Sequence, residues 1–579
     1  MLLPWVLAAI AIAASGGWAL FGPRGEGASR SMKLTVLPPS DMVSSGPIDI
    51  SADGRALVFT AAGPSGSDRL YVRTLDSLEA RALSGTDGAS APFFSADGRS
   101  IGFFAGKKLK RIDLAGGSPR ELADAPDHRG GSWGSQNVIV FAPQGGGPIL
   151  QVPASGGTAT PATTLDTTAQ ETSHRWPHFL PDGKRFLFMS RKPKPPGRLA
   201  IEVGSVDGNV RTRLGDSSSG GAFARGQLYF LRETTLFAQA FDARTLAVSG
   251  EPVPVAEDVW RDPNTDGLTA FAVAEDGTLA YRRGGMNKSQ LTWLDRQGRQ
   301  LGTVGPPGVV GGLALSPDNR RVLTDLTDTS SDAAALFVRD TATGMTTRAA
   351  FGTANQVAGL FSPDGRFIVF SWDLKGAFNL YRLEIGAAGE AASLVVNAVW
   401  KFPESWSRDG RFLSYTQSEP GKPRDIWILP MTGGAAPFPF VQTPAEEWGS
   451  AFSPDGRFLA YVSDDSGSPE VFIRTFPSSP AKWQVSDGGG VSPIWRSDGK
   501  ELFYLVPDGR LVAVPIAVTA GGLEPGAART LFQNTGLRPP ALGTANPYAV
   551  TSDGQRFLAK VLSGKQESLP IVLQIGTRP

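Results

Sequence analysis

A short apolar run, an Asp-Gly turn and a second apolar run recur along this chain about every 45 residues. The clearest copies read Ser-Pro-Asp-Gly-Arg-Phe-Leu-Ala-Tyr at 453–461 and Ser-Pro-Asp-Gly-Arg-Phe-Ile-Val-Phe at 362–370. Each copy predicts a strand, a tight turn and a second strand, because the aspartate accepts hydrogen bonds from nearby backbone N–H groups and glycine tolerates positive φ. Successive residues after the turn are apolar, which is typical of a strand covered on both faces.

Ten copies contain the turn aspartate, and two more, at 132–141 and 224–230, fill the double-length gaps between them. The pattern therefore predicts twelve units. Asp276 and Asp318 mark two of the turns. The other turn residues, to which we assign a structural role, are Asp53 and Gly54, Asp97 and Gly98, Asp182 and Gly183, Asp364 and Gly365, Asp409 and Gly410, Asp455 and Gly456, Asp498 and Gly499, and Asp553 and Gly554.

Each unit continues with a third strand that has an aromatic or aliphatic centre, as at 70–73 and 426–429. A glycine turn and a more polar fourth strand follow. Four strands per unit at this period predict the blades of a β-propeller. The expected fold class is therefore all-β.

Twelve blades exceed the four to eight of an ordinary propeller, so we expect two six-bladed β-propellers in tandem. The runs before units one and seven, 33–39 and 300–307, resemble each other, and so do the closing runs 291–294 and 571–574. We therefore assign residues 33–296 to propeller 1 and 297–579 to propeller 2, each with an outermost strand from its own N-terminus. Alternatively, 295–298 is the turn of a hairpin within one blade, which moves the boundary to about residue 310.

Composition narrows the class of protein further. Gly 70 and Pro 45 suit turn-rich β structure, and 41% hydrophobic residues supply a core. Lys+Arg 56 against Asp+Glu 55 is a balanced charge, so we expect no nucleic-acid partner. Cys 0 excludes disulfides, thiolate metal sites and a cysteine nucleophile. No cofactor and no metal are expected.

The N-terminal segment predicts a membrane anchor. Residues 2–21 carry no charge and are long enough to cross a hydrocarbon core of about 30 Å. Residues 1–32 are thus assigned to a transmembrane or signal-anchor helix and a linker. The expected location is the bacterial cell membrane, crossed once, with the propellers on the extracytoplasmic, periplasmic side. Alternatively, the small residues at 11–14 allow cleavage and secretion to the periplasm.

The repeat resembles that of the TolB-like β-propeller family, over nearly everything after residue 32. The runs 228–239 and 291–298 further resemble the C-terminal half of bacterial receptor-type serine/threonine kinases, and 3–8 resembles the start of their membrane span. The resemblance implies an extracytoplasmic double propeller that serves as a sensor. The kinase part is missing, because the chain has no Gly-rich phosphate loop with its lysine, no His-Arg-Asp and no Asp-Phe-Gly. A kinase partner would then act in trans.

Few residues are candidates for catalysis, metal binding or ligand binding. His174 and His178 are four apart, but on a strand that spacing separates them by about 13 Å, too far to share a metal ion. The Gly-x-Ser-x-Gly motif of serine hydrolases does not occur. Binding residues in propellers gather where the innermost strands begin, at the mouth of the channel. The ligand-binding candidates there are His174, Arg175, Trp176, Lys401, Glu404, Trp406, Glu446, Glu447 and Trp448. The alternative for the tryptophans is packing between blades.

The function expected from these features is a non-catalytic, membrane-anchored double propeller that senses a ligand or binds a protein. Its ligand would be a protein, peptide or glycan. Two alternatives stay open: a periplasmic scaffold like TolB, and a propeller enzyme, a lyase or hydrolase, that acts in the channel.

Overall fold

The computed structural model describes residues 32–37, 42, 46–62, 68–192, 199–262, 265–284, 288–328, 333–352, 354–375, 377–386, 390–419, 422–477, 481–519, 522–534, 536–537, 546–563 and 569–575. These residues form antiparallel sheets and no helix, which confirms the all-β prediction. The predicted helix at 2–21 lies outside the described residues. No helix that could cross a membrane is found in the part of the chain that the structure describes.

The described strands form twelve sheets, eleven with four strands and one with five, which is consistent with the blades of β-propellers. Within a sheet the chain usually runs from the first strand outward. We call the side where the first strands begin the mouth side, and the side of the Asp-Gly turns the turn side. Because successive strands are antiparallel, the connections from second to third strand, and from one sheet to the next, lie on the mouth side.

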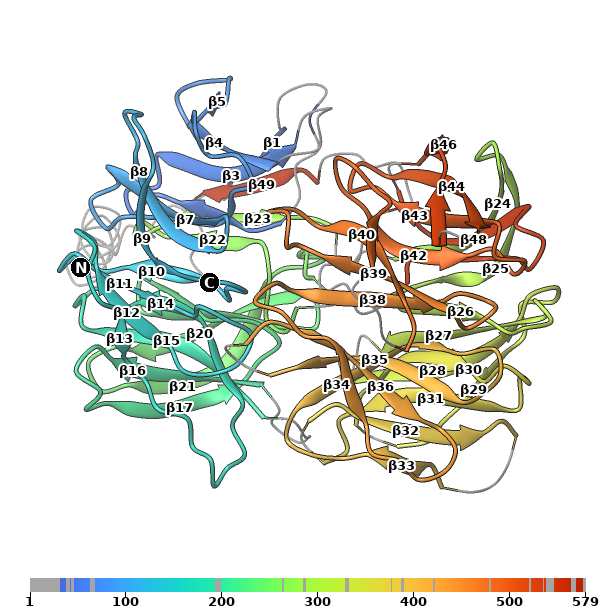
Figure 1. Cartoon of the computed structure of the whole chain (residues 1–579). Coiled ribbons are helices and arrows are strands. Elements are labelled where there is room, and N and C mark those ends of the chain that lie inside the picture. The colour runs from blue at the N-terminus through green and yellow to red at the C-terminus, as the bar shows by residue number, and fades with distance from the viewer. Residues whose placement is uncertain are drawn as a thin grey trace, which may run out of the picture.

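Six sheets form the first body, on the left of Figure 1. In order from the first strand outward they are β2 (Ile48–Ile50), β3 (Ala56–Ala62), β4 (Asp68–Thr74) and β5 (Arg81–Ala82); β6 (Ser90–Phe94), β7 (Ser100–Ala105), β8 (Lys108–Asp113) and β9 (Arg120–Asp124); β10 (Gly131–Trp133), β11 (Val138–Phe141), β12 (Leu150–Pro153) and β13 (Thr160–Pro161); β14 (Ser173–Phe179), β15 (Arg185–Arg191), β16 (Leu199–Ser205) and β17 (Arg211–Asp216); β18 (Ala222–Ala224), β19 (Gln227–Arg232), β20 (Thr235–Asp242) and β21 (Ala247–Ala256); and β22 (Phe271–Val273), β23 (Leu279–Arg282), β49 (Ile571–Ile575) and β1 (Met32–Val36).

The other six sheets form the second body, on the right of Figure 1. They are β26 (Val310–Leu315), β27 (Arg321–Asp328), β28 (Ala333–Asp340) and β29 (Thr346–Arg348); β30 (Gln356–Phe361), β31 (Phe367–Trp372), β32 (Asn379–Glu384) and β33 (Ala392–Val395); β34 (Trp400–Trp406), β35 (Phe412–Ser418), β36 (Asp425–Pro430) and β37 (Phe438–Val441); β38 (Glu447–Phe452), β39 (Phe458–Ser463), β40 (Glu470–Thr475) and β41 (Lys482–Gln484); β42 (Val491–Trp495), β43 (Glu501–Leu505), β44 (Arg510–Thr519) and β46 (Arg529–Gln533), with β45 (Gly522–Pro525) also on β44; and β47 (Tyr548–Val550), β48 (Arg556–Leu562), β24 (Ser289–Asp295) and β25 (Gln300–Gly308).

First strands pack against one another from sheet to sheet. In the first body β2 contacts β6, β6 contacts β10, β10 contacts β14, β18 contacts β22, and β22 returns to β2. In the second body the contacts run from β26 through β30, β34 and β38 to β42, and β47 returns to β26. Apolar clusters fill the space between neighbouring sheets, as where Val58 and Val72 meet Phe94, Ile101 and Phe103. Full burial of such a side chain stabilises the fold by about 1.5–3 kcal/mol.

The first body is completed by a strand that follows the whole second body in sequence, whereas the strands of the second body, β24 to β48, are consecutive. Strand β49 pairs with β1 and β23 in the first body, and β24 pairs with β48 in the second. In Figure 1 the red β49 lies among blue strands, and the green β24 and β25 lie among red ones. The predicted closing runs were thus found in equivalent places, but their assignment to the bodies was wrong: 291–294 completes the second body and 571–574 the first.

Local contacts hold these closing strands in place. Strands β24 and β25 form one hairpin, and its turn contains residues 296–297, where the predicted division falls. In that turn Arg296 forms an ion pair with Glu501 of β43, with Nη2 2.9 Å from Oε1, which fastens the hairpin to the second body. In the first body the buried Arg282 donates to the carbonyl oxygen of Leu569, at 2.9 Å, just before β49. An arginine thus fastens each closing strand, Arg296 from the hairpin itself and Arg282 from the body that β49 completes.

The Asp-Gly turns share one hydrogen-bond pattern. In the copy at 453–458, Ser453 Oγ donates to Asp455 Oδ1 at 2.7 Å and accepts from Phe458 N at 2.9 Å. Arg457 N donates to the same Asp455 oxygen at 3.1 Å, and Gly456 has a φ of 70°. A serine two residues before the aspartate does the same at Asp53, Asp97, Asp318, Asp364 and Asp409. The repeat therefore fixes its turn through the serine as well as through Asp-Gly.

Candidate functional site

First strands in both bodies carry a bulge at one fixed place. Six residues before the turn aspartate, the backbone has a φ between 41° and 65° in five of the sheets. The pairing register shifts around the same residue. A bulge of this kind bends the strand and turns a side chain in a new direction. The residues in this position are Ala91, Trp176, Ala358, Gly449 and Ser492.

Trp176 is the large exception among these small residues. Its Nε1 donates to the carbonyl oxygen of Asp266 at 2.8 Å. Three glycines surround it, each just before a different first strand: Gly130 before β10, Gly220 before β18 and Gly267 before β22. A Cβ added to any of them would lie 2.6 to 2.8 Å from an atom of Trp176. The indole therefore occupies the place where the mouth ends of four sheets of the first body converge.

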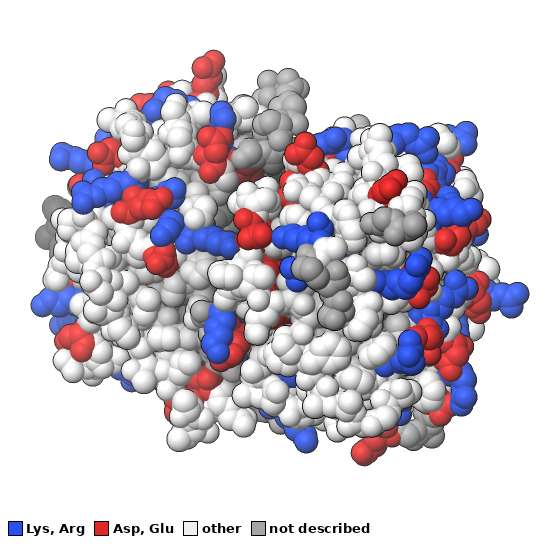
Figure 2. Space-filling view, viewed as in Figure 1, with Lys and Arg blue, Asp and Glu red and all other residues white. Residues whose placement is uncertain are grey.

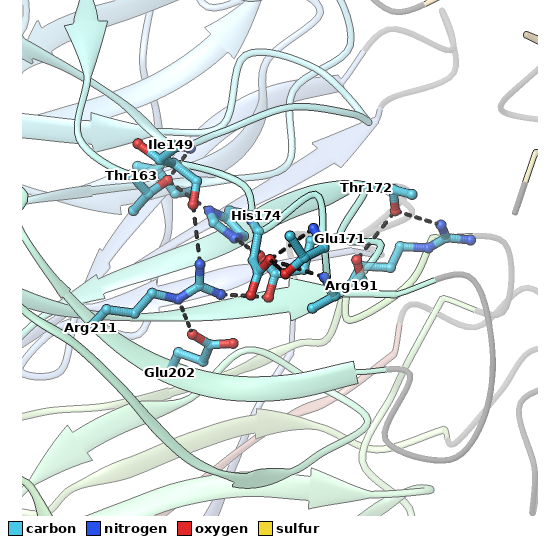
Figure 3. Close-up of polar contacts among 12 residues, drawn as sticks. Ile149, Thr163, Glu171, Thr172, His174, Arg191, Glu202 and Arg211 are labelled. Atoms are coloured by element: carbon cyan, nitrogen blue, oxygen red, sulfur yellow. Dashed lines mark hydrogen bonds and ion pairs between the residues drawn. The ribbon is translucent and has the colours of Figure 1, made fainter. Parts of the chain in front are cut away.

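His174 lies in a buried polar cluster on the same strand (Figure 3). Its Nδ1 is 2.8 Å from Thr163 Oγ1 and its Nε2 is 3.2 Å from Glu171 Oε2. Arg211 bridges Glu171 and Glu202, with N···O distances of 2.5 and 2.7 Å. Burial alone would raise the pKa of Glu171, but hydrogen bonds from His174, the Asp166 amide and Arg211 lower it to about 2. The cluster thus joins β14, β16 and β17 to one another, which indicates a structural role.

Lys401 and Glu447 occupy the same repeat position as His174, eight residues before the turn aspartate, and so does Gln356. Lys401 Nζ donates to the carbonyl oxygen of Val399 at 2.5 Å and to the side-chain oxygens of Asn379 and Asn397. Burial lowers the pKa of Lys401 to about 8. These residues are all buried, so the position is a recurring polar site inside the blade and not a single convergent pocket.

Like Gln356, Glu447 is incompletely hydrogen-bonded in this buried position. Its Oε1 accepts from Thr443 Oγ1, whereas Oε2 is buried with no hydrogen-bond partner among the described residues. Burial, assisted by the nearby negative charges of Asp425 and Asp464, raises the pKa of Glu447 to about 7. A carboxyl group in such surroundings changes its protonation near neutral pH.

Glu404 connects two sheets of the second body. Its Oε1 accepts from Gly449 N and its Oε2 from Ser450 N, both at 2.7 Å, and Thr416 Oγ1 donates to Oε1. Burial raises its pKa despite these donors. Trp406 donates through Nε1 to Gly410 O at 3.1 Å, near the turn side. Glu404 and Trp406 therefore do not form one site with Lys401.

Glu446 and Trp448 lie at the junction of the bodies. Arg424 stacks over the Trp448 ring at 4.4 Å from its centre and pairs with Glu446 at 2.7 Å. The Glu446 amide donates to Asp464 Oδ1 at 2.9 Å, and Asp464 Oδ2 pairs with Lys107 of the first body at 2.7 Å. Lys107 and Asp464 both lie in connections on the mouth side, so the mouth sides of the two bodies meet here.

Sequence reasoning missed the residues around Arg175. Arg129, Asp127, Arg191 and Asp266 approach it from three connections on the mouth side. They share no spacing relative to the turn aspartates, so no repeat position identifies them. The remaining charges are dispersed: on the face in Figure 2 basic and acidic side chains alternate without a large area of one sign.

Other places in the structure are weaker candidates for a functional site. A surface hollow of about 410 Å³ lies on the turn side of the first body, lined by residues such as Leu180, Asp182, Phe223 and Phe241, and it contains none of the candidates. Burial lowers the pKa of His178 to about 4. Across the described ranges, no group of three or more His, Asp or Glu side chains is placed to hold a metal ion.

No protein-family model matches the chain, and no curated protein matches it. Solved structures similar to it include a TolB candidate from Agrobacterium tumefaciens, 18% identical with a TM-score of 0.39, covering 48% of this chain and 99% of that one. TolB from Acinetobacter baumannii is 14% identical with a TM-score of 0.26, covering 51% and 61%. The tricorn protease is 12% identical with a TM-score of 0.29, covering 84% and 58%. Because these TM-scores are low, we base the fold on strand pairing.

Proposed function

We propose that the chain is two six-bladed β-propellers, the first closed by a strand that follows the second propeller in sequence, and that it serves as a membrane-anchored module for binding a protein partner. The return of β22 to β2, and of β47 to β26, supports two closed rings. Full closure of a ring removes exposed sheet edges. In this proposal each propeller consists of one body as defined above: the second is the continuous stretch 289–562, and the first combines residues 32–284 with 569–575.

The observation that carries the binding proposal is the fixed meeting of the two mouth sides. The chain passes from the first body to the second between β23 and β24 and returns between β48 and β49, and the Lys107–Asp464 ion pair adds a direct contact. The Arg191 guanidinium also lies 6.0 Å from the centre of the Trp400 ring, across the same junction. A rigid, pre-arranged surface lowers the entropic cost of binding, which suits an interaction module.

Photo-crosslinking in cells tests the binding surface. Phe351, on the mouth side, and Met345, on the turn side, belong to the same body and are 78% and 70% exposed. We would replace each with a photoreactive phenylalanine analogue in the full chain. Discrete crosslinked species from position 351, absent from position 345, are expected. Equal patterns from both positions, or no crosslinked species from position 351, would contradict a partner on the mouth side.

The anchor is proposed at residues 2–21, and fractionation tests it. The full chain should sediment with membranes and be released by detergent but not by high salt, because an apolar segment of this length crosses the hydrocarbon core. The same chain without 2–21 should be soluble. Recovery of the full chain in the soluble fraction with residues 1–21 attached would reject the anchor.

We further propose that the partner is a kinase supplied by a separate polypeptide. Support comes only from the sequence resemblance of 228–239 and 291–298 to receptor-type kinases. Genomic DNA upstream of the first codon, translated in three frames, tests this: kinase motifs there would support it, and an unrelated gene would favour a stand-alone binding protein.

A further inference from the structure

Three buried arginines gather on the mouth side of the first body. Arg129 lies before β10, Arg175 in β14 and Arg191 at the end of β15, and each is at most 8% exposed. The positive charges of Arg191 and Arg129, together with the negative charges of Asp266 and Asp127, act on Arg175. The cluster therefore holds three positive and two negative charges, a surplus of one positive charge.

Both carboxylates are already bound by the other two arginines. Asp127 forms a two-point pair with Arg129, with distances of 2.7 and 3.0 Å from Oδ1 and Oδ2 to Nη1 and Nη2. Asp266 Oδ2 accepts from Arg191 Nε at 2.7 Å, and Arg191 Nη1 also donates to Thr172 Oγ1, as Figure 3 shows. Neither carboxylate reaches ion-pair distance of Arg175.

Arg175 is thus left with neutral acceptors. Its Nε donates to Ser173 Oγ and its Nη2 to the carbonyl oxygen of Gly145, at 2.5 Å. Its Nη1 has no hydrogen-bond partner in the described part of the chain and is not closed off from solvent. The undescribed stretches that adjoin this region in sequence, 193–198 and 263–264, contain no Asp or Glu.

A buried charge without a counter-charge is costly, and two more guanidinium groups nearby increase the cost. Burial, and then Arg191 and Arg129, lowers the pKa of Arg175. An anion that binds at Nη1 would offset this cost and neutralise the surplus charge. Nη1, one arm of the planar guanidinium fork, can donate to a carboxylate oxygen in a charge-assisted hydrogen bond, and a single surplus positive charge matches a monoanion better than a phosphate with nearly two negative charges.

We propose that Arg175 anchors an anion site that accepts one carboxylate group at the junction of the two bodies. Trp176 lies beside the site as the next residue, and the Arg191–Trp400 contact places the second body at its edge. The inference concerns a small anion and does not depend on the proposed protein partner.

Urea unfolding of the full chain in acetate, exchanged for chloride at constant ionic strength, tests the site. Acetate should raise the urea midpoint of the wild type and saturate. At ten times the dissociation constant, the equilibrium constant for unfolding falls about elevenfold. Arg175→Gln should abolish this response, whereas the control Arg185→Gln, at an arginine paired with Asp182 on the turn side, should retain it.

The same variants separate a ligand site from a structural role. In chloride alone, Arg175→Gln should be at least as stable as the wild type, because it removes a buried charge that has no counter-charge, whereas Arg191→Gln should be less stable because it removes the ion pair with Asp266. Should Arg175→Gln fail to fold, Arg175→Lys keeps the charge without the fork and should need several-fold more acetate. An acetate response unchanged in both variants, or absent from the wild type, overturns the proposal.

The source of the carboxylate follows from two further probes. Triglycine that acts at lower concentration than acetate, with triglycine amide inactive, would assign the site to a peptide C-terminus. Equal half-maximal concentrations for triglycine and acetate would assign it to a small organic acid.

Discussion

Because β49 completes the first body, a substitution near residue 573 should loosen sheets built from the opposite end of the chain. Leu573 of β49 is 2% exposed and packs with Ile48, Leu57 and Phe59 of the first body. Leu573→Ala should therefore destabilise the sheets built from residues 46–62 and 269–284. The reciprocal change is Leu291→Ala in β24, whose side chain packs with Val310 and Leu558 of the second body.

The size of the effect follows from burial. Both leucines are almost fully buried, and replacement of such a leucine by alanine costs about 2–5 kcal/mol, part from lost burial and part from the cavity left behind. A free-energy loss of that size raises the equilibrium constant for local opening by roughly 30-fold to several-thousand-fold. It is also a large fraction of the stability of an ordinary domain.

Hydrogen–deuterium exchange measured on peptides locates the loss. Leu573→Ala should speed exchange of amides in β2, β3 and β23 and leave those in β43 and β48 unchanged. Leu291→Ala should do the opposite, which makes the two variants controls for each other. Faster exchange in β43 and β48 after Leu573→Ala, with β2 and β3 protected, would refute the placement of β49 in the first body.

Three further changes test the repeat and the buried positions. Gly456→Val puts a β-branched residue at a φ of 70°, so we expect a loss of about 1–3 kcal/mol in the free energy of unfolding by urea titration, with the exposed Arg457→Ala as a control near zero. Glu447→Gln tests the raised pKa: a carboxyl with a pKa of about 7 in the folded state and near 4.5 when unfolded stabilises the fold at low pH and loses that contribution as pH rises towards and through 7. The wild type should therefore lose more stability than the variant between pH 5 and 8, and equal losses would contradict this. Gly130→Ala should destabilise the wild type more than it destabilises Trp176→Ala, because its new methyl group meets the indole; additive effects in this double-mutant cycle would show that the two residues do not touch.

The repeat itself could be predicted because its signal is local. An apolar run, a serine, Asp-Gly and a second apolar run specify one hairpin within a dozen residues, as at 453–461. The spacing then gives the number of sheets. Counting back eight residues from the turn aspartate also places His174, Lys401 and Glu447 in one recurring position, a regularity that argues for a structural role.

The partner of each closing strand could not be predicted. The runs 291–294 and 571–574 are both apolar and hold equivalent places in their sheets, so the local pattern does not distinguish the two bodies. The choice depends on distant contacts such as Arg296 with Glu501. The same holds for Arg175, whose neighbours Arg129 and Arg191 come from separate connections.

The position of β49 near the end of the sequence also bears on how the protein is made. During synthesis, the sheet of β22, β23 and β1 lacks β49 until residues 283–570 have been translated. The first body therefore stays incomplete while the second is already able to assemble. Meanwhile β23 presents an unpaired edge, which is a template for contacts with other chains. Such a nascent chain most needs a chaperone in its N-terminal half. A tag placed after residue 575 would be attached to the sheet that contains β1 and would disturb it.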